Sequence, residues 1–189
     1  MSVQIRTARK LALAFSFGAL AFSAVAGSAF ADPMVGGAAM YPSRNIIQNA
    51  VHSKDHTTLV AAVKAAGLVP TLESKGPFTV FAPTNEAFAK LPAGTVDTLL
   101  KPENKAKLTA VLTYHVLPGR LTAAVLMHDI AMGHGKAMLK TVQGEDLTFT
   151  KSGKGLMITD AKGDHAKVTI ANVMQSNGVI HVINTVLLP

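Results

Sequence analysis

Residues 78–88 read FTVFAPTNEAF, and this stretch decides how the chain around it is interpreted. Its first five residues, Phe78–Ala82, are aromatic and β-branched, which predicts a strand. Pro83 ends that strand because it has no backbone N–H to donate to a neighbour. Thr84 then supplies a hydroxyl that can cap a helix running to Lys90. The stretch therefore predicts a strand that passes directly into a helix.

Helical patterns lie on both sides of this stretch. Upstream, apolar residues at spacings of three and four predict a helix that Gly67 stops. A shorter amphipathic pattern over residues 44–52 predicts a helix before it. Downstream, residues 95–100 and the segment that begins at Pro102 also read as helices, since proline suits the first helical turn. The stripe before Gly67 consists of Leu59, Ala62, Val63 and Ala66.

The pattern changes after Tyr114, and most of the remaining chain reads as strands separated by turns. Because helices fill the first half and strands the second, the sequence predicts the α+β class rather than alternating βαβ units. Both faces of residues 179–183 are mostly apolar, which predicts a central strand. Residues 121–127 are apolar and fit either a helix or a strand. The predicted strands are 114–117, 137–142, 147–150, 156–159, 167–173, 179–183 and 186–188.

Three blocks of this sequence together resemble the fasciclin domain family. They are TVFAPTNEAF at 79–88, YHVLPG at 114–119 and NGVIHVIN at 177–184, the last followed by VLLP. Their order and spacing match the family, and the resemblance covers about residues 41–189. It implies a fasciclin-type β-wedge sheet with helices packed over it. It also implies a role in adhesion, matrix contact or protein binding, usually outside the cytoplasm and with no cofactor.

The resemblance further implies where a partner would bind. It points to Tyr114 and His115 in the second block, and to Asn172 and Met174 just before the third. In animal members, the Tyr-His pair and an Asp at the position of Asn172 have been linked to integrin contact. Asn172 keeps the hydrogen-bonding shape of that Asp without its charge, and no Arg-Gly-Asp sequence is present. The alternative interpretation is structural, with Tyr114 filling the core and His115 bonding to the backbone.

Residues 1–31 have the features of a signal peptide. A short basic region precedes an uncharged apolar stretch, and Ala29-Phe30-Ala31 places small residues at the two positions that a signal peptidase reads. The alternative is an uncleaved membrane anchor, because residues 11–30 are long enough to cross a bilayer. We expect a signal peptide at 1–31, a flexible leader at 32–43, a single fasciclin domain at 44–189, and a secreted or periplasmic location.

The composition excludes several classes of function. The chain of 189 residues has no cysteine, which excludes thiol catalysis and thiolate metal sites. Of its net charge of +7, three come from the basic region at residues 6–10, and the remaining lysines are scattered. With 5% aromatic residues, the chain lacks the basic, stacking surface typical of nucleic-acid binding. No Gly-x-Ser-x-Gly or Gly-rich phosphate motif occurs. Two groups stay open as metal sites: His52, Asp55 and His56, and His128, Asp129 and His134 near methionines that suit copper.

These observations favour an exported, non-catalytic, monomeric protein that binds a protein or polysaccharide at a cell surface or matrix. We expect no nucleic-acid contact, and membrane contact only through an uncleaved signal segment. The alternative is a periplasmic carrier of a small apolar ligand, held between the wedge and the helices. A carrier requires a contiguous apolar pocket on the order of several hundred Å³. A hydrolase would require Ser, His and Asp side chains to meet in space.

Overall fold

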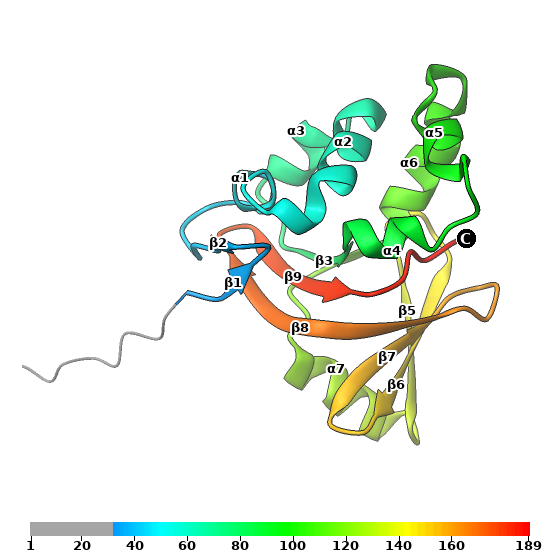
Figure 1. Cartoon of the computed structure of the whole chain (residues 1–189). Helices are drawn as coiled ribbons and strands as arrows, with labels where there is room; N and C mark the ends of the chain where they lie inside the picture. The colour runs from blue at the N-terminus through cyan, green and yellow to red at the C-terminus, as the bar shows by residue number, and fades with distance from the viewer. Residues whose placement is uncertain (1–31) are drawn as a thin grey trace, which may run out of the picture. The chain divides into compact units, whose positions relative to one another are not determined.

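Helices occupy most of the first half of the described chain, residues 32–189 of the computed structural model, and strands most of the second half (Figure 1). This distribution confirms the predicted α+β class. No helix within these residues combines the length and hydropathy needed to cross a membrane. The helices are α1 (Ile46–Ala50), α2 (Thr57–Ala66), α3 (Val69–Glu73), α4 (Asn85–Ala89), α5 (Thr95–Leu100), α6 (Lys105–Tyr114) and α7 (Ala123–Met132), with the 3-10 turns η1 (Lys54–His56) and η2 (Pro102–Asn104).

Seven of the strands form one sheet in the order β4-β3-β9-β8-β7-β6-β5. β3 and β9 are parallel, and the other neighbours are antiparallel. The sheet curls so that its two edges approach each other, and the N–H of Val142, just after β5, donates to the carbonyl of Val116 in β4 at 2.8 Å. The strands are β1 (Met34–Val35), β2 (Ala38–Ala39), β3 (Phe78–Pro83), β4 (Val116–Pro118), β5 (Lys136–Lys140), β6 (Asp146–Ser152), β7 (Gly155–Thr159), β8 (His165–Gln175) and β9 (Gly178–Ile183).

β3 and β9 separate two apolar cores. Ile180 and Val182 of β9 pack with helices α1 to α6, whereas Ile183 packs with α7 and strands β5 to β8. β3 divides in the same way, with Val80 in the first core and Phe81 in the second. Figure 1 shows α1 to α6 on one side of these strands and α7 on the other. The predicted central strand with two apolar faces is therefore confirmed.

Local signals set the helix ends that the sequence predicts. The Thr84 hydroxyl accepts a hydrogen bond from the N–H of Ala87 at 3.3 Å and caps α4. Gly67 ends α2 with a φ of 73°, a left-handed conformation that costs glycine little. Asn45 and Gln48 form a reciprocal capping box at the start of α1. These three ends depend on residues within a few positions of each helix terminus.

The turn between β8 and β9 is held by a buried side chain rather than by its backbone alone. The Oδ1 atom of Asn177 accepts a hydrogen bond from the N–H of Ile46 at 3.0 Å. Its Nδ2 atom donates to the carbonyls of Leu72 and Ser74 at 2.7 and 2.8 Å. Asn177 therefore joins the start of α1 and the end of α3 to the sheet.

The structure corrects the expectation of a flexible leader at residues 32–43. Residues 34–39 form the β1–β2 hairpin, and the side chains of Val35 and Met40 are only 4% and 2% exposed. Both residues pack into the core beneath the helices. The folded region therefore begins before residue 44. The predicted signal peptide at 1–31 lies outside the described residues and stays a prediction.

Two further expectations differ from the structure, and one open interpretation is resolved. Tyr114 ends helix α6 and does not start a strand. The stretch at 121–127, which fits either a helix or a strand, contributes to helix α7, and this helix also carries His128 and Asp129. Residues 186–188 belong to no strand. The surrounding side chains hold this last segment in place.

Candidate functional site

The Tyr114 side chain lies entirely in the core. Its hydroxyl accepts a hydrogen bond from the N–H of Ala161 at 2.9 Å and contacts the carbonyl oxygen of Asp146 at 3.3 Å. Burial raises the pKa of Tyr114. The ring fills the core, and its hydroxyl ties helix α6 to the start of β6 and to the turn after β7.

His115 is also buried, at 2% exposure, and both of its ring nitrogens are engaged. Nε2 accepts a hydrogen bond from the N–H of Leu187 at 3.0 Å. Nδ1 lies 2.8 Å from the carbonyl oxygen of Val111, so Nδ1 carries the proton and donates it there. Burial lowers the pKa of His115 to about 4, although the Val111 carbonyl acts in the opposite direction. The ring is therefore neutral at pH 7.

The buried carboxylate of Asp160 also holds the C-terminal residues in place, as His115 does. Oδ2 of Asp160 accepts a hydrogen bond from the N–H of Leu188 at 2.9 Å. Its Oδ1 atom accepts from the N–H groups of Lys162 and Asp164 at 3.0 and 2.9 Å. Asp160 and His115 therefore hold residues 187 and 188 against the sheet.

The structure corrects the expectation that Tyr114 and His115 contact a partner directly. Both side chains are inaccessible, and their polar atoms are occupied by the protein itself. The alternative structural interpretation of the Tyr-His pair is confirmed. Any effect that this pair has on binding must act through the fold.

Asn172, in contrast, is exposed and lies where the pairing of β8 with β9 is irregular. Its φ of 60° is left-handed, which asparagine tolerates better than most residues. Its Oδ1 atom accepts a hydrogen bond from the N–H of Ala123 at 2.7 Å, at the start of α7. Its own N–H donates to Nδ1 of His181 at 3.4 Å. The position therefore links the bulged strand to the first turn of a helix.

His181, in β9, contacts both the bulged part of β8, through Asn172, and the segment just before α7, through Leu121. Its Nε2 atom lies 2.9 Å from the carbonyl oxygen of Leu121, and its ring stacks on Phe81 with centroids 5.5 Å apart. Burial lowers the pKa of His181. The ring is therefore a neutral structural bridge.

Met174, two residues after Asn172 in β8, is half-buried. Arg120, which was not among the predicted site residues, contacts the end of the same strand. Arg120 is exposed, and its Nη2 atom donates to the carbonyls of Gln175 and Ser176, each at 3.1 Å. The segment before α7 thus runs beside the end of β8. We call the surface formed by Arg120, Asn172 and Met174 the bulge surface.

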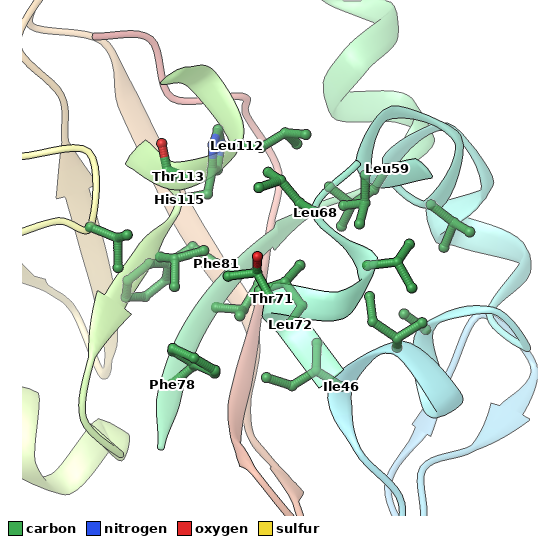
Figure 2. Close-up of a pocket in the computed structure, with 18 of the residues that line it drawn as sticks. Ile46, Leu59, Leu68, Thr71, Leu72, Phe78, Phe81, Leu112, Thr113 and His115 are labelled. Carbon is green, nitrogen blue, oxygen red and sulfur yellow. The ribbon is translucent and has the colours of Figure 1, made fainter. Parts of the chain in front are cut away.

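An apolar cavity of about 60 Å³ lies between helices α1 to α3, α6 and strand β3 (Figure 2). Ile46, Leu59 and Leu72 line it from the helices, and Phe78 from β3. A second cavity of about 30 Å³ shares several of its lining residues. For comparison, an engineered cavity of about 150 Å³ in another protein binds benzene. Neither cavity reaches the volume that the carrier hypothesis requires.

The two histidine groups considered as metal sites do not converge. His52 is exposed, whereas His56 is buried with Nδ1 2.8 Å from the Ser53 hydroxyl. Burial lowers the pKa of His56, although the backbone of Ala82 acts in the opposite direction. Its Nε2 atom has no hydrogen-bond partner among the described residues. Within residues 32–189, no three His, Asp or Glu side chains come close enough to share a metal ion.

Comparisons with known proteins place these features in context. A family model described as the Fasciclin domain matches residues 54–189. The chain is 46% identical over 185 residues to Protein sll1483 of Synechocystis sp., covering 90% of this chain and 95% of that protein. It is 34% identical over 166 residues to the cell surface glycolipoprotein MPB83 of Mycobacterium bovis, covering 87% of this chain and 64% of that protein. Its fold matches a FAS1 domain pair from the insect cell adhesion molecule Fasciclin I, with a TM-score of 0.69 and 17% identity. The match covers 77% of this chain and 51% of the insect chain.

Proposed function

The chain belongs to the fasciclin domain family, and from this premise we propose that it is an exported, non-catalytic binding protein of the cell surface, periplasm or extracellular matrix. Family membership supports an adhesion-type role, and the name of the mycobacterial relative supports a surface location. The buried histidines support a non-catalytic role, because His115 and His181 use their ring nitrogens to hold the fold.

We assign partner contact to the bulge surface. Of the residues that the family resemblance indicates, Asn172 is exposed and Met174 half-buried, whereas Tyr114 and His115 are closed off. Arg120 adds a positive charge and Met174 an adaptable apolar side chain. Since Asn172 is uncharged, we expect this contact to be independent of divalent cations. The exposure of the bulge surface is the observation that carries this assignment.

The test is capture of partners from envelope and extracellular fractions by the purified protein. We expect a saturable partner that survives addition of EDTA and is lost in the variants Arg120→Glu and Met174→Ala. Lys162→Glu is the matched control, because it makes the same change of charge as Arg120→Glu at an exposed turn. Capture that is unchanged in both bulge variants would contradict the assignment. Turnover of generic ester or glycoside substrates would contradict the non-catalytic role.

A further inference from the structure

The outer face of strands β5 to β8 is open to solvent in the described chain. Helix α7 packs against the inner face through Leu126 and Ile130, and the inward residues of these strands are buried. Residues paired across neighbouring strands lie on the same face, so the strand registers define the outer rows. One row is Lys136, Thr150, Met157 and Lys167, and the next is Met138, Thr148, Thr159 and His165.

Within β5 to β8 and their turns, the acidic residues lie at one end of the strands, whereas lysines lie at both. The end at the β6–β7 turn carries four exposed lysines and none of the acidic residues of the four strands and their turns. The opposite end carries four acidic residues, and the one ion pair found among residues 32–189 lies there, between Lys140 and Asp146 at 3.3 Å. We call Lys136, Lys151, Lys154 and Lys167 the lysine end. Lys136 and Lys167 belong to the outer row and Lys154 lies in the turn, whereas Lys151 pairs with the buried Leu156 and lies on the other face. The acidic residues opposite are Glu145, Asp146, Asp160 and Asp164, beside Lys140 and Lys162.

We propose that the lysine end is a contact surface for an acidic polysaccharide. The proposal rests on the proposed function and names a class of partner for it. Lys136 and Lys167 stand at the two ends of one row, three strand spacings apart, or about 14 Å along the sheet. A polymer with repeated anionic groups can contact both lysines at once. Thr150, between them, offers a hydroxyl to the hydroxyls of a sugar.

Other polyanions fit this surface less well. Protein interfaces rely on buried aromatic and arginine anchors, and the outer rows contain no Phe, Tyr, Trp or Arg. Single-stranded nucleic acids need aromatic side chains on which bases stack, and none is present in these rows. Lysines combined with threonines suit an acidic sugar polymer, whose groups are carboxylates or sulfates and hydroxyls.

The lysine end is not evident in the linear sequence, where its members are separated. Lys136 begins β5, Lys151 and Lys154 flank the β6–β7 turn, and Lys167 lies in β8. The antiparallel registers bring them to one end of the sheet. The adjoining helix α7 carries Asp129, which forms no ion pair with them.

The test is binding of the purified protein to immobilised alginate, a polyuronate, with neutral dextran as the reference surface. We expect binding to alginate alone, weakening as salt is raised because charges are screened. Lys136→Glu/Lys167→Glu should lower the affinity about tenfold or more, since each lysine near an anionic surface contributes about fivefold. Lys101→Glu/Lys162→Glu makes the same change of net charge at exposed sites elsewhere and should lower affinity less than about threefold.

Three outcomes would overturn the proposal. They are no binding of the unaltered protein to alginate, an equal loss in both double variants, and stronger binding to phosphatidylglycerol vesicles than to alginate. Lys136→Ala/Lys167→Ala checks that the loss reflects missing cations rather than added acids, and thermal melting checks that each variant is folded. If a partner is captured through the bulge surface while alginate is not bound, this inference fails and the proposed function stands.

Discussion

The Nε2 atom of His115 accepts a hydrogen bond from the backbone N–H of Leu187, 72 residues farther along the chain, at 3.0 Å. This contact joins the end of helix α6 to the C-terminal segment, which belongs to no strand. Since Nδ1 donates to Val111 in the same helix, the neutral ring bridges two elements at once. The contribution of His115 to function is therefore expected to be through stability.

Substitution of His115 by alanine should lower the free energy of unfolding by about 3 kcal/mol. The change opens a cavity and leaves the N–H of Leu187 and the carbonyl of Val111 without their partner. Urea unfolding followed by circular dichroism measures the loss. His52→Ala, at an exposed position, should change stability by less than about 0.5 kcal/mol. Normal stability of His115→Ala together with loss of partner capture would restore a direct binding role.

Stability should fall as the pH is lowered from about 6.5 toward about 4. The folded-state pKa of His115 is about 4 and the usual value is 6.5, so between these values the unfolded state binds more protons. His115 alone accounts for about 3 kcal/mol of this loss. His56 and His181, whose pKa values are also lowered, act in the same direction. Urea midpoints at pH 7.5, 5.5 and 4.5 measure the effect, and a smaller dependence is expected in His115→Gln; an equal dependence would exclude His115 as its source.

Asn172→Asp should raise stability by about 0.5 kcal/mol at neutral pH. The carboxylate would keep the bond to the N–H of Ala123 and add a negative charge at the positive end of α7. Asn172→Gly and Asn172→Ala both remove the side-chain bond, but only glycine adopts a φ of 60° without strain. We therefore expect alanine to cost about 1 kcal/mol more than glycine. Thermal unfolding of the three variants measures these differences, and an alanine variant as stable as the glycine variant would contradict the role of φ.

The sequence predicts those elements whose signals are local. Gly67 and Thr84 end and begin helices through their own conformation and hydroxyl, so neighbouring residues suffice to place them. The alternation of residues 179–183 predicts a strand buried on both faces because the period of a strand is two. The three family blocks supply the rest of the fold class.

What the sequence does not predict depends on contacts between distant segments. Residues 32–43 show no periodic pattern, and Val35 and Met40 are buried only because helices pack over them. The apolar run at 121–127 fits two structures, and its packing on β5 and β6 selects the helix. Of the candidate site, sequence reasoning named Asn172 and Met174 but not Arg120, whose contacts are 55 and 56 residues away. No local pattern marks such an arginine.

Asn177→Ala should be among the most destabilising single substitutions in the chain, at about 3 kcal/mol or more. It removes two buried hydrogen bonds and one partly buried one, and leaves the N–H of Ile46 and the carbonyls of Leu72 and Ser74 without this partner. Asn104→Ala is the matched control, because Asn104 makes one exposed bond, to the carbonyl of Thr98, and should cost about 1 kcal/mol or less. Urea unfolding of both variants measures the difference. If the two variants lose similar amounts of unfolding free energy, the turn before β9 is held by its backbone, and the Asn177 side chain does not join α1 and α3 to the sheet.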